Sequence, residues 1–70
     1  NIYPNPVKDI LNVEAENIDL VELYDIYGRK LYSEEKSDNV RIDMNNFCSG
    51  VYFVKIYSEG KSSVEKIMKK

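Results

Sequence analysis

The chain has 70 residues, of which 43% are hydrophobic and 31% charged, and its formal net charge is −2. This length allows one small domain without a deep active-site cleft, and the composition is that of a globular domain, not a disordered tail. The charge gives no basic footprint for nucleic acid, and no apolar run approaches the roughly 20 residues of a membrane span, so we expect neither nucleic-acid binding nor membrane insertion.

The chemistry available to the chain is also narrow. Cys48 is the only cysteine, and the sequence has no histidine. A lone cysteine forms no internal disulfide or thiolate cluster, and this one lacks the imidazole that usually activates a cysteine nucleophile. The acidic residues fit no EF-hand calcium loop, and no phosphate loop or hydrolase motif is present. We therefore expect no enzyme activity, no cofactor and no metal.

The chain begins with Tyr3-Pro4-Asn5-Pro6, whose prolines fix φ and lack N–H donors, so this segment suits a sheet edge or a lead-in to a strand. Period-two alternation of apolar and polar residues follows and indicates half-buried strands. The strands that it predicts are 9–15, 19–26, 30–35, 39–44 and 50–58. The closing stretch 61–70 alternates less clearly and also fits a frayed helix.

The connections between these strands carry turn residues. In the run 25–29 we expect the Asp25 carboxylate to accept backbone N–H groups and Gly28 to adopt the left-handed conformation of a tight hairpin. We expect Gly60 to adopt the same conformation in a second hairpin. Both hairpins join antiparallel strands.

The run 45–50, NNFCSG, is too polar for a strand. It predicts a single helical turn with Asn45 near its N-cap and Phe47 closing the open end of the core. Short strands joined by hairpins, without a long helix, predict an all-β fold. The fold that we expect is an immunoglobulin-like antiparallel β-sandwich of about six to seven short strands.

The sequence contains 6 tyrosines, and sugar-binding sandwiches use aromatic rings to stack on sugars. Those inside predicted strands, where the ring is normally buried, are Tyr24, Tyr32, Tyr52 and Tyr57. Tyr3 lies in the entrance segment and Tyr27 at a turn tip. A carbohydrate-binding module is therefore an alternative to a purely structural use of these rings.

Three lysines, Lys66, Lys69 and Lys70, lie in the last five residues of the sequence. Charges of this kind are usually solvated, and lysine also protects an exposed strand edge from aggregation. The sharper alternative is a recognition element for a partner, and composition leaves both open.

Several short motifs together resemble one family over the whole chain. In order they are Tyr3-Pro4-Asn5-Pro6, Leu11-x-Val13, Val21-x-Leu23-Tyr24-Asp25-x-x-Gly28-Arg29, Ile42-Asp43-Met44, Ser49-Gly50-Val51-Tyr52-Phe53-Val54-Lys55 and Lys66-Ile67. Each motif is short, but their order and spacing are specific. The chain resembles a type A C-terminal sorting domain of the type IX (Por) secretion system.

This resemblance implies a single non-catalytic immunoglobulin-like domain, residues 1–70, at the C-terminus of a secreted protein from a Gram-negative bacterium of the Bacteroidota. Its partners would be the preceding cargo domains, the outer-membrane translocon and a sortase-like cysteine protease that cuts just upstream of the domain. The protein would pass through the periplasm to the cell surface or the extracellular space. By match of motif, the sorting signal would include Tyr3, Pro4, Asn5, Pro6, Gly50, Tyr52 and Lys66.

The residues themselves leave alternatives to this function. A carbohydrate-binding accessory module and a passive structural spacer both remain, and exposed edge strands fit either a monomer or a weak edge-paired dimer. Gly50 lets the chain leave the preceding turn, and Tyr52 can pack inward in phase with Val54 and Ile56. Motif residues can therefore serve folding, recognition or both.

Overall fold

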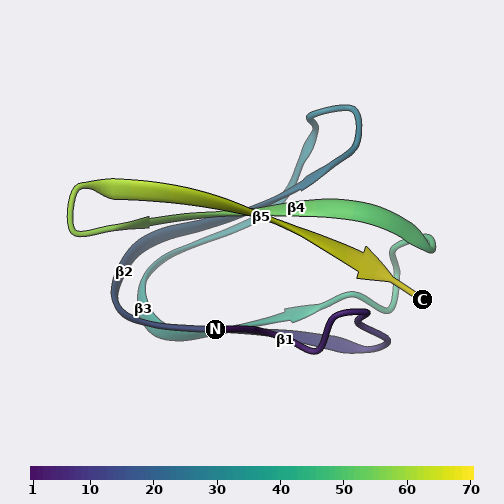
Figure 1. Ribbon diagram of the computed structural model, residues 1–70, viewed down its shortest axis with the longest axis horizontal. Coiled ribbons are helices and arrows are strands. Elements are labelled where there is room, and N and C mark those ends of the chain that lie inside the picture. The colour runs from purple at the N-terminus through teal and green to yellow at the C-terminus, as the bar shows by residue number, and fades with distance from the viewer.

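The computed structural model describes all 70 residues and is all-β (Figure 1). Its strands are β1 (Ile2–Tyr3), β2 (Ile10–Asp25), β3 (Lys30–Asp43), β4 (Gly50–Ser58) and β5 (Lys61–Lys69). They form one 5-stranded antiparallel sheet that curls on itself. No helix long and apolar enough to span a membrane is present.

The long strand β2 organises this sheet. One of its edges pairs with β3 from end to end. Its other edge is shared, because β1 pairs with the first half of β2 and β4 pairs with the second half. β5 then pairs with β4, so the two halves of β2 belong to different rows of strands.

The β2–β3 ribbon bends in its middle, which lets the two halves of the sheet face each other (Figure 1). The pairing register shifts between Glu14 and Ile18 at this bend. Asn17 has φ of 54° and Lys36 has φ of 48°, so both residues adopt the left-handed conformation that increases local twist. The bend follows from these bulged residues without any break in either strand.

The core lies inside the bend. Alternate residues of four strands point into it, and two loop residues complete it. Its 12 members are Val7, Leu11, Val13, Ile18, Val21, Leu23, Val40, Ile42, Met44, Tyr52, Val54 and Ile67. Burying one such aliphatic side chain stabilises the fold by about 1.5–3 kcal/mol, so the four strands β2 to β5 and the loop residues Val7 and Met44 all contribute to stability.

The expectation of an all-β fold is confirmed, but an immunoglobulin-like sandwich of many short strands is not observed. The segments 9–15 and 19–26 belong to the single strand β2, and 30–35 and 39–44 belong to the single strand β3. The polar residues between these segments suggested loops, whereas in the structure they form a bulge within a continuous pair of strands. The result is a half-barrel of five strands.

Two local expectations also need correction. The stretch 61–70 is not a frayed helix, because Lys61–Lys69 pairs with β4 along its whole length. The run 45–50 forms a β-turn instead of a helical turn, in which the Phe47 N–H donates to the Met44 carbonyl at 3.0 Å. The capping acceptor is Asp43, whose Oδ1 lies 2.9 Å from the backbone nitrogen of Asn45.

Candidate functional site

The first, middle and last motifs of the sequence lie beside one another at one end of the sheet. Gly50 pairs with Lys69, and Tyr52 pairs with Ile67, so the start of β4 lies along the end of β5. The other edge of β5 is occupied by the entrance segment, where Val7 forms a parallel bridge with Lys69. Segments far apart in the sequence therefore form three neighbouring rows.

The Asn5 side chain occupies the position of a strand neighbour at the edge of β5. Its Oδ1 accepts the Met68 N–H at 3.0 Å, and its Nδ2 donates to the Lys66 carbonyl at 3.4 Å. A primary amide can do this because it carries one acceptor and donors in the same arrangement as a peptide group. Pro4 and Pro6 flank Asn5 and have no N–H groups of their own to pair.

Val7 continues this pairing by its backbone. Its N–H donates to the Met68 carbonyl at 2.8 Å, and its carbonyl accepts the Lys70 N–H at 2.8 Å. The Val7 side chain is fully buried in the core. Sequence reasoning missed Val7, although a single apolar residue directly after the second proline was the available signal.

The side chain of Tyr3 points toward β2, on the side of the entrance segment away from β5. The residue is 43% exposed, and its hydroxyl donates to Glu14 Oε2 at 2.5 Å. This hydrogen bond to a carboxylate, together with desolvation, raises the pKa of Tyr3 above its usual value. Tyr3 thus ties β1 to β2 and makes no contact of this kind with β5.

Lys66 presents a free ammonium group. The residue is exposed and its side chain forms no hydrogen bond or ion pair, although its carbonyl accepts the Asn5 amide. Lys69 differs, because its Nζ donates to the Lys70 carbonyl at 2.9 Å. Of the sequence-predicted site residues, Lys66 is therefore the one whose charged group forms no hydrogen bond or ion pair within the domain.

Gly50 and Tyr52 form the link between the β4–β5 pair and the preceding loop. Gly50 has φ of +148°, a conformation that other residues rarely adopt, while a Cβ there would meet no atom within 4 Å. The Tyr52 ring is buried, its hydroxyl donates to the Cys48 carbonyl at 2.6 Å, and its ring centroid lies 5.9 Å from that of Phe47. Burial raises the pKa of Tyr52.

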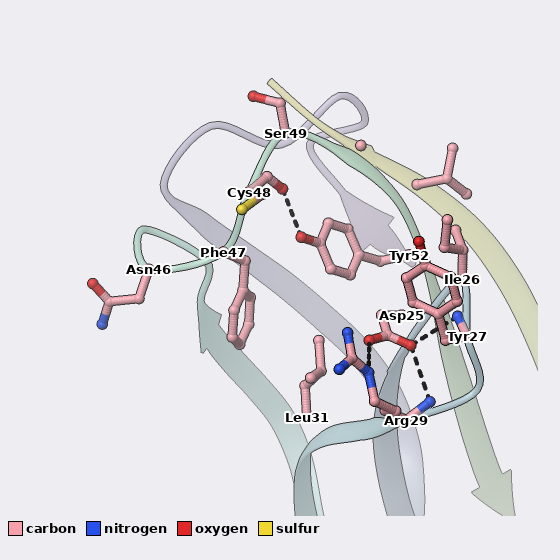
Figure 2. Close-up of a pocket in the computed structure, with 12 residues that line it drawn as sticks. Asp25, Ile26, Tyr27, Arg29, Leu31, Asn46, Phe47, Cys48, Ser49 and Tyr52 are labelled. Atoms are coloured by element: carbon pink, nitrogen blue, oxygen red, sulfur yellow. Dashed lines mark hydrogen bonds and ion pairs between the residues drawn. The ribbon is translucent and has the colours of Figure 1, made fainter.

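A pocket of about 440 Å³ opens between this loop and the β2–β3 hairpin tip (Figure 2). Asp25, Arg29, Phe47, Cys48 and Tyr52 are among its lining residues. Figure 2 shows that the Asp25 carboxylate points back to its own hairpin and that the Tyr52 hydroxyl points to Cys48. The Asp25 carboxylate and the Tyr52 hydroxyl are thus both engaged within the fold.

Asp25 shapes the hairpin tip next to this pocket. Its Oδ1 accepts the N–H groups of Tyr27 at 2.9 Å and Arg29 at 3.0 Å, and its Oδ2 accepts Arg29 Nε at 2.7 Å. Burial alone would raise the pKa of Asp25, but these hydrogen bonds and the guanidinium charge hold it below its ordinary value. Gly28, with φ of +81°, completes the turn.

The second glycine turn is remote from the converging motifs. Gly60 has φ of 76° and, with Glu59, forms the two-residue connection between Ser58 and Lys61. This connection lies at the opposite end of the β4–β5 pair from Gly50 and Lys69. Gly60 therefore belongs to a hairpin and does not contribute to the candidate site.

One further buried carboxylate was not anticipated from the sequence. Glu22 is only 7% exposed, and it accepts the Tyr24 hydroxyl at 2.9 Å and Lys30 Nζ at 3.4 Å. Burial raises the pKa of Glu22, but these donors outweigh burial and lower it overall. Alternation placed Glu22 on a solvent face, whereas neighbouring side chains cover it there.

Comparison with known families supplies the identity. A family model described as the secretion system C-terminal sorting domain matches the chain over residues 1–70. No individual curated protein matches it. Domains of this family are signals of type IX secretion and are generally non-catalytic. Because the match spans the whole chain, the protein belongs to the family of secretion system C-terminal sorting domains.

Proposed function

We propose that residues 1–70 form the C-terminal address of a larger exported protein, which binds the type IX translocon and brings its cargo to the cell surface or the extracellular space. The observation that carries this proposal is the family match over residues 1–70. The geometry supports it, because the motifs that contain Asn5, Gly50 and Lys66 converge on one end of the sheet.

The proposal includes the route and the processing step. The cargo passes through the periplasm, and a sortase-like cysteine protease then cuts upstream of the domain. Residues 1–6 lie outside the buried core, so cargo domains that precede the sorting domain would leave this core undisturbed.

We assign no catalytic step to the domain itself. The Asp25 carboxylate is engaged by its own hairpin, and the Tyr52 hydroxyl is bonded to the Cys48 carbonyl. Cys48 is exposed, but the sequence has no histidine to act as its base. The chemistry of processing then belongs to the protease, for which this chain is a substrate.

A fusion of residues 1–70 to the C-terminus of a periplasmic reporter tests this function. In a bacterium with the type IX pathway, we expect the reporter on the cell surface or in the medium, detected by surface labelling and fractionation. The same fusion in a strain without the translocon is the control and should stay in the periplasm. Retention in the competent strain would contradict the proposed function.

The carbohydrate-binding alternative gains no support from the geometry. Its exposed rings would be Tyr3 and Tyr27, which lie beside opposite ends of β2 and form no common row. The ring of Tyr27 is also covered by the Arg29 guanidinium, 5.3 Å from its centroid. We propose that the domain acts as a monomer, since the free edge of β3 is lined with charges that disfavour edge pairing.

A further inference from the structure

The outward side of the β4–β5 pair carries a group of apolar side chains around one lysine. Val51 pairs with Met68, and Phe53 pairs with Lys66, so their side chains share a face. This is the face opposite to Tyr52 and Ile67, which are buried in the core. We call the group the outer patch and define it by the residues Val51, Phe53, Val64, Lys66 and Met68.

The fold leaves the apolar side chains of the outer patch partly or largely exposed. Val64 is 60% exposed and Met68 is 50% exposed, while Val51 and Phe53 are half-buried beside them. Neighbouring exposed apolar side chains on a small soluble domain mark an interaction site more often than scattered single ones do. None of the four belongs to the buried core.

The charges of the outer patch define what could cover it. Lys66 has no anionic partner, and Lys55 lies on the same face, with its Nζ 5.0 Å from the centroid of the Tyr57 ring. The carboxylate that faces Lys55 across the strands is Glu22, and Lys30 already pairs with it. This face is therefore positive, on a chain whose net charge is −2.

We propose that the outer patch is the docking surface for a protein partner that presents carboxylates around an apolar centre. The proposal rests on the proposed function and assigns this partner to the secretion machinery. A protein fits better than a glycan because the outer patch contains a single aromatic ring, that of the half-buried Phe53, and the neighbouring Tyr57 ring has Lys55 Nζ 5.0 Å from its centroid. Oppositely charged surfaces also give such docking its orientation.

The entrance segment fixes the backbone of this surface from the side, along the edge of β5. Asn5 and Val7 bond the backbone of β5 at Lys66, Met68 and Lys70 along the edge that β4 does not use. They leave the outward side chains of Lys66 and Met68 uncovered. The convergence of motifs thus fixes the backbone beneath the outer patch without occupying it.

The test uses the exported reporter fusion described above, with single substitutions in the domain. Val64→Asp and Lys66→Glu should each lower the surface-exposed reporter at least tenfold, while Lys66→Arg should keep export within about twofold of the unchanged fusion. Ile26→Asp is the matched apolar control because Ile26 is also 60% exposed. Arg41→Glu is the matched charge control on β3, and both controls should be exported normally.

Each outcome decides the proposal. Melting temperatures of the purified domains separate lost docking from lost folding, and we expect those of Val64→Asp and Lys66→Glu to match the unchanged domain. Normal export of both variants would overturn the outer patch while leaving the proposed function intact, whereas failure of the unchanged fusion would overturn both. If the domain binds purified cell-surface polysaccharide and Val64→Asp abolishes this binding, the outer patch is a glycan site and the proposal is overturned. If the domain forms a dimer in sedimentation and Val64→Asp abolishes the dimer, the outer patch binds a second copy and the proposal is also overturned.

Discussion

The β2–β3 hairpin tip and the end of β5 are held by hydrogen bonds that join residues at very different separations along the sequence. At the tip, Asp25 bonds the backbone of Tyr27 and Arg29, which lie 2 and 4 positions away. At the end of β5, Asn5 bonds Lys66 and Met68, which lie 61 and 63 positions away. The tip can form as soon as its hairpin forms, whereas the end of β5 is completed only when both ends of the chain have met.

This difference gives the β5 end a property that suits a sorting signal. The backbone beneath Lys66 and Met68 is fixed only in the assembled domain, because its partners come from the entrance segment and from β4. A partner that docks there would distinguish a folded domain from an unfolded one. The hairpin tip carries no such information, since its bonds are local.

Breaking the local network should have the largest effect on stability. Asp25→Ala removes the acceptor of three hydrogen bonds and leaves the N–H groups of Tyr27 and Arg29 without it. We expect the melting temperature to fall by about 10 °C or more, measured by circular dichroism. Arg29→Ala, which keeps both backbone bonds, is the control and should fall less. Equal losses would show that the ion pair, not the turn, carries the effect.

Breaking the pairing between Asn5 and β5 should lower stability less than Asp25→Ala does, but it should reduce export of the reporter. Asn5→Ala removes two hydrogen bonds at an exposed edge, which predicts a loss of about 1 kcal/mol and a melting temperature lower by about 4–8 °C. Surface delivery of the reporter should nevertheless fall, because the backbone of β5 frays where Lys66 is presented. Asn46, an exposed loop residue without a hydrogen bond, gives the matched control Asn46→Ala. Undiminished export of Asn5→Ala would separate this motif from recognition.

Acid should weaken the tip through its carboxylates. The folded-state pKa values of Asp25 and Glu22 are lowered, because hydrogen bonds and nearby cations outweigh the opposing effect of burial. Such groups stabilise the fold above their unfolded pKa of about 4 and lose this contribution as the pH falls through the folded value. We expect a constant melting temperature between about pH 5 and pH 7 and a decrease below about pH 4. Asp25→Asn should reduce this decrease, and a melting temperature that rises on acidification would contradict the assignment.

The same contrast explains which features could be predicted from the sequence. The roles of Asp25 and Gly28 depend on neighbours within the same turn, and alternation placed Val21, Leu23 and Val54 inside correctly. The resemblance to the sorting-domain family rested on the order of motifs and is confirmed over the full length. These features depend on residues near one another in the sequence or on an order that is visible in it.

The missed features depend on pairing between distant segments. Nothing near Asn5 shows that its amide bonds β5. Glu22 is an exception, because its partners Tyr24 and Lys30 lie only 2 and 8 positions away, and it was missed because alternation alone placed it on a solvent face. The bulges at Asn17 and Lys36 resembled loops because polar residues occur at both, and only the ladder between β2 and β3 shows that the strands continue through them.

The smallest change in stability should accompany Lys66→Ala. The Lys66 ammonium has no partner, and the bond from Asn5 reaches its carbonyl, which alanine keeps. Exposed substitutions of this kind usually change stability by less than about 0.5 kcal/mol, so the melting temperature should stay within about 4 °C of the unchanged domain. Export of the reporter should fall all the same, because the positive charge of the outer patch is lost, while Lys61→Ala at the far end of β5 should have no effect.

If Asn5→Ala and Lys66→Ala act on one surface, the double variant should export little worse than either alone. Additive losses would mean that the entrance segment and Lys66 serve separate steps.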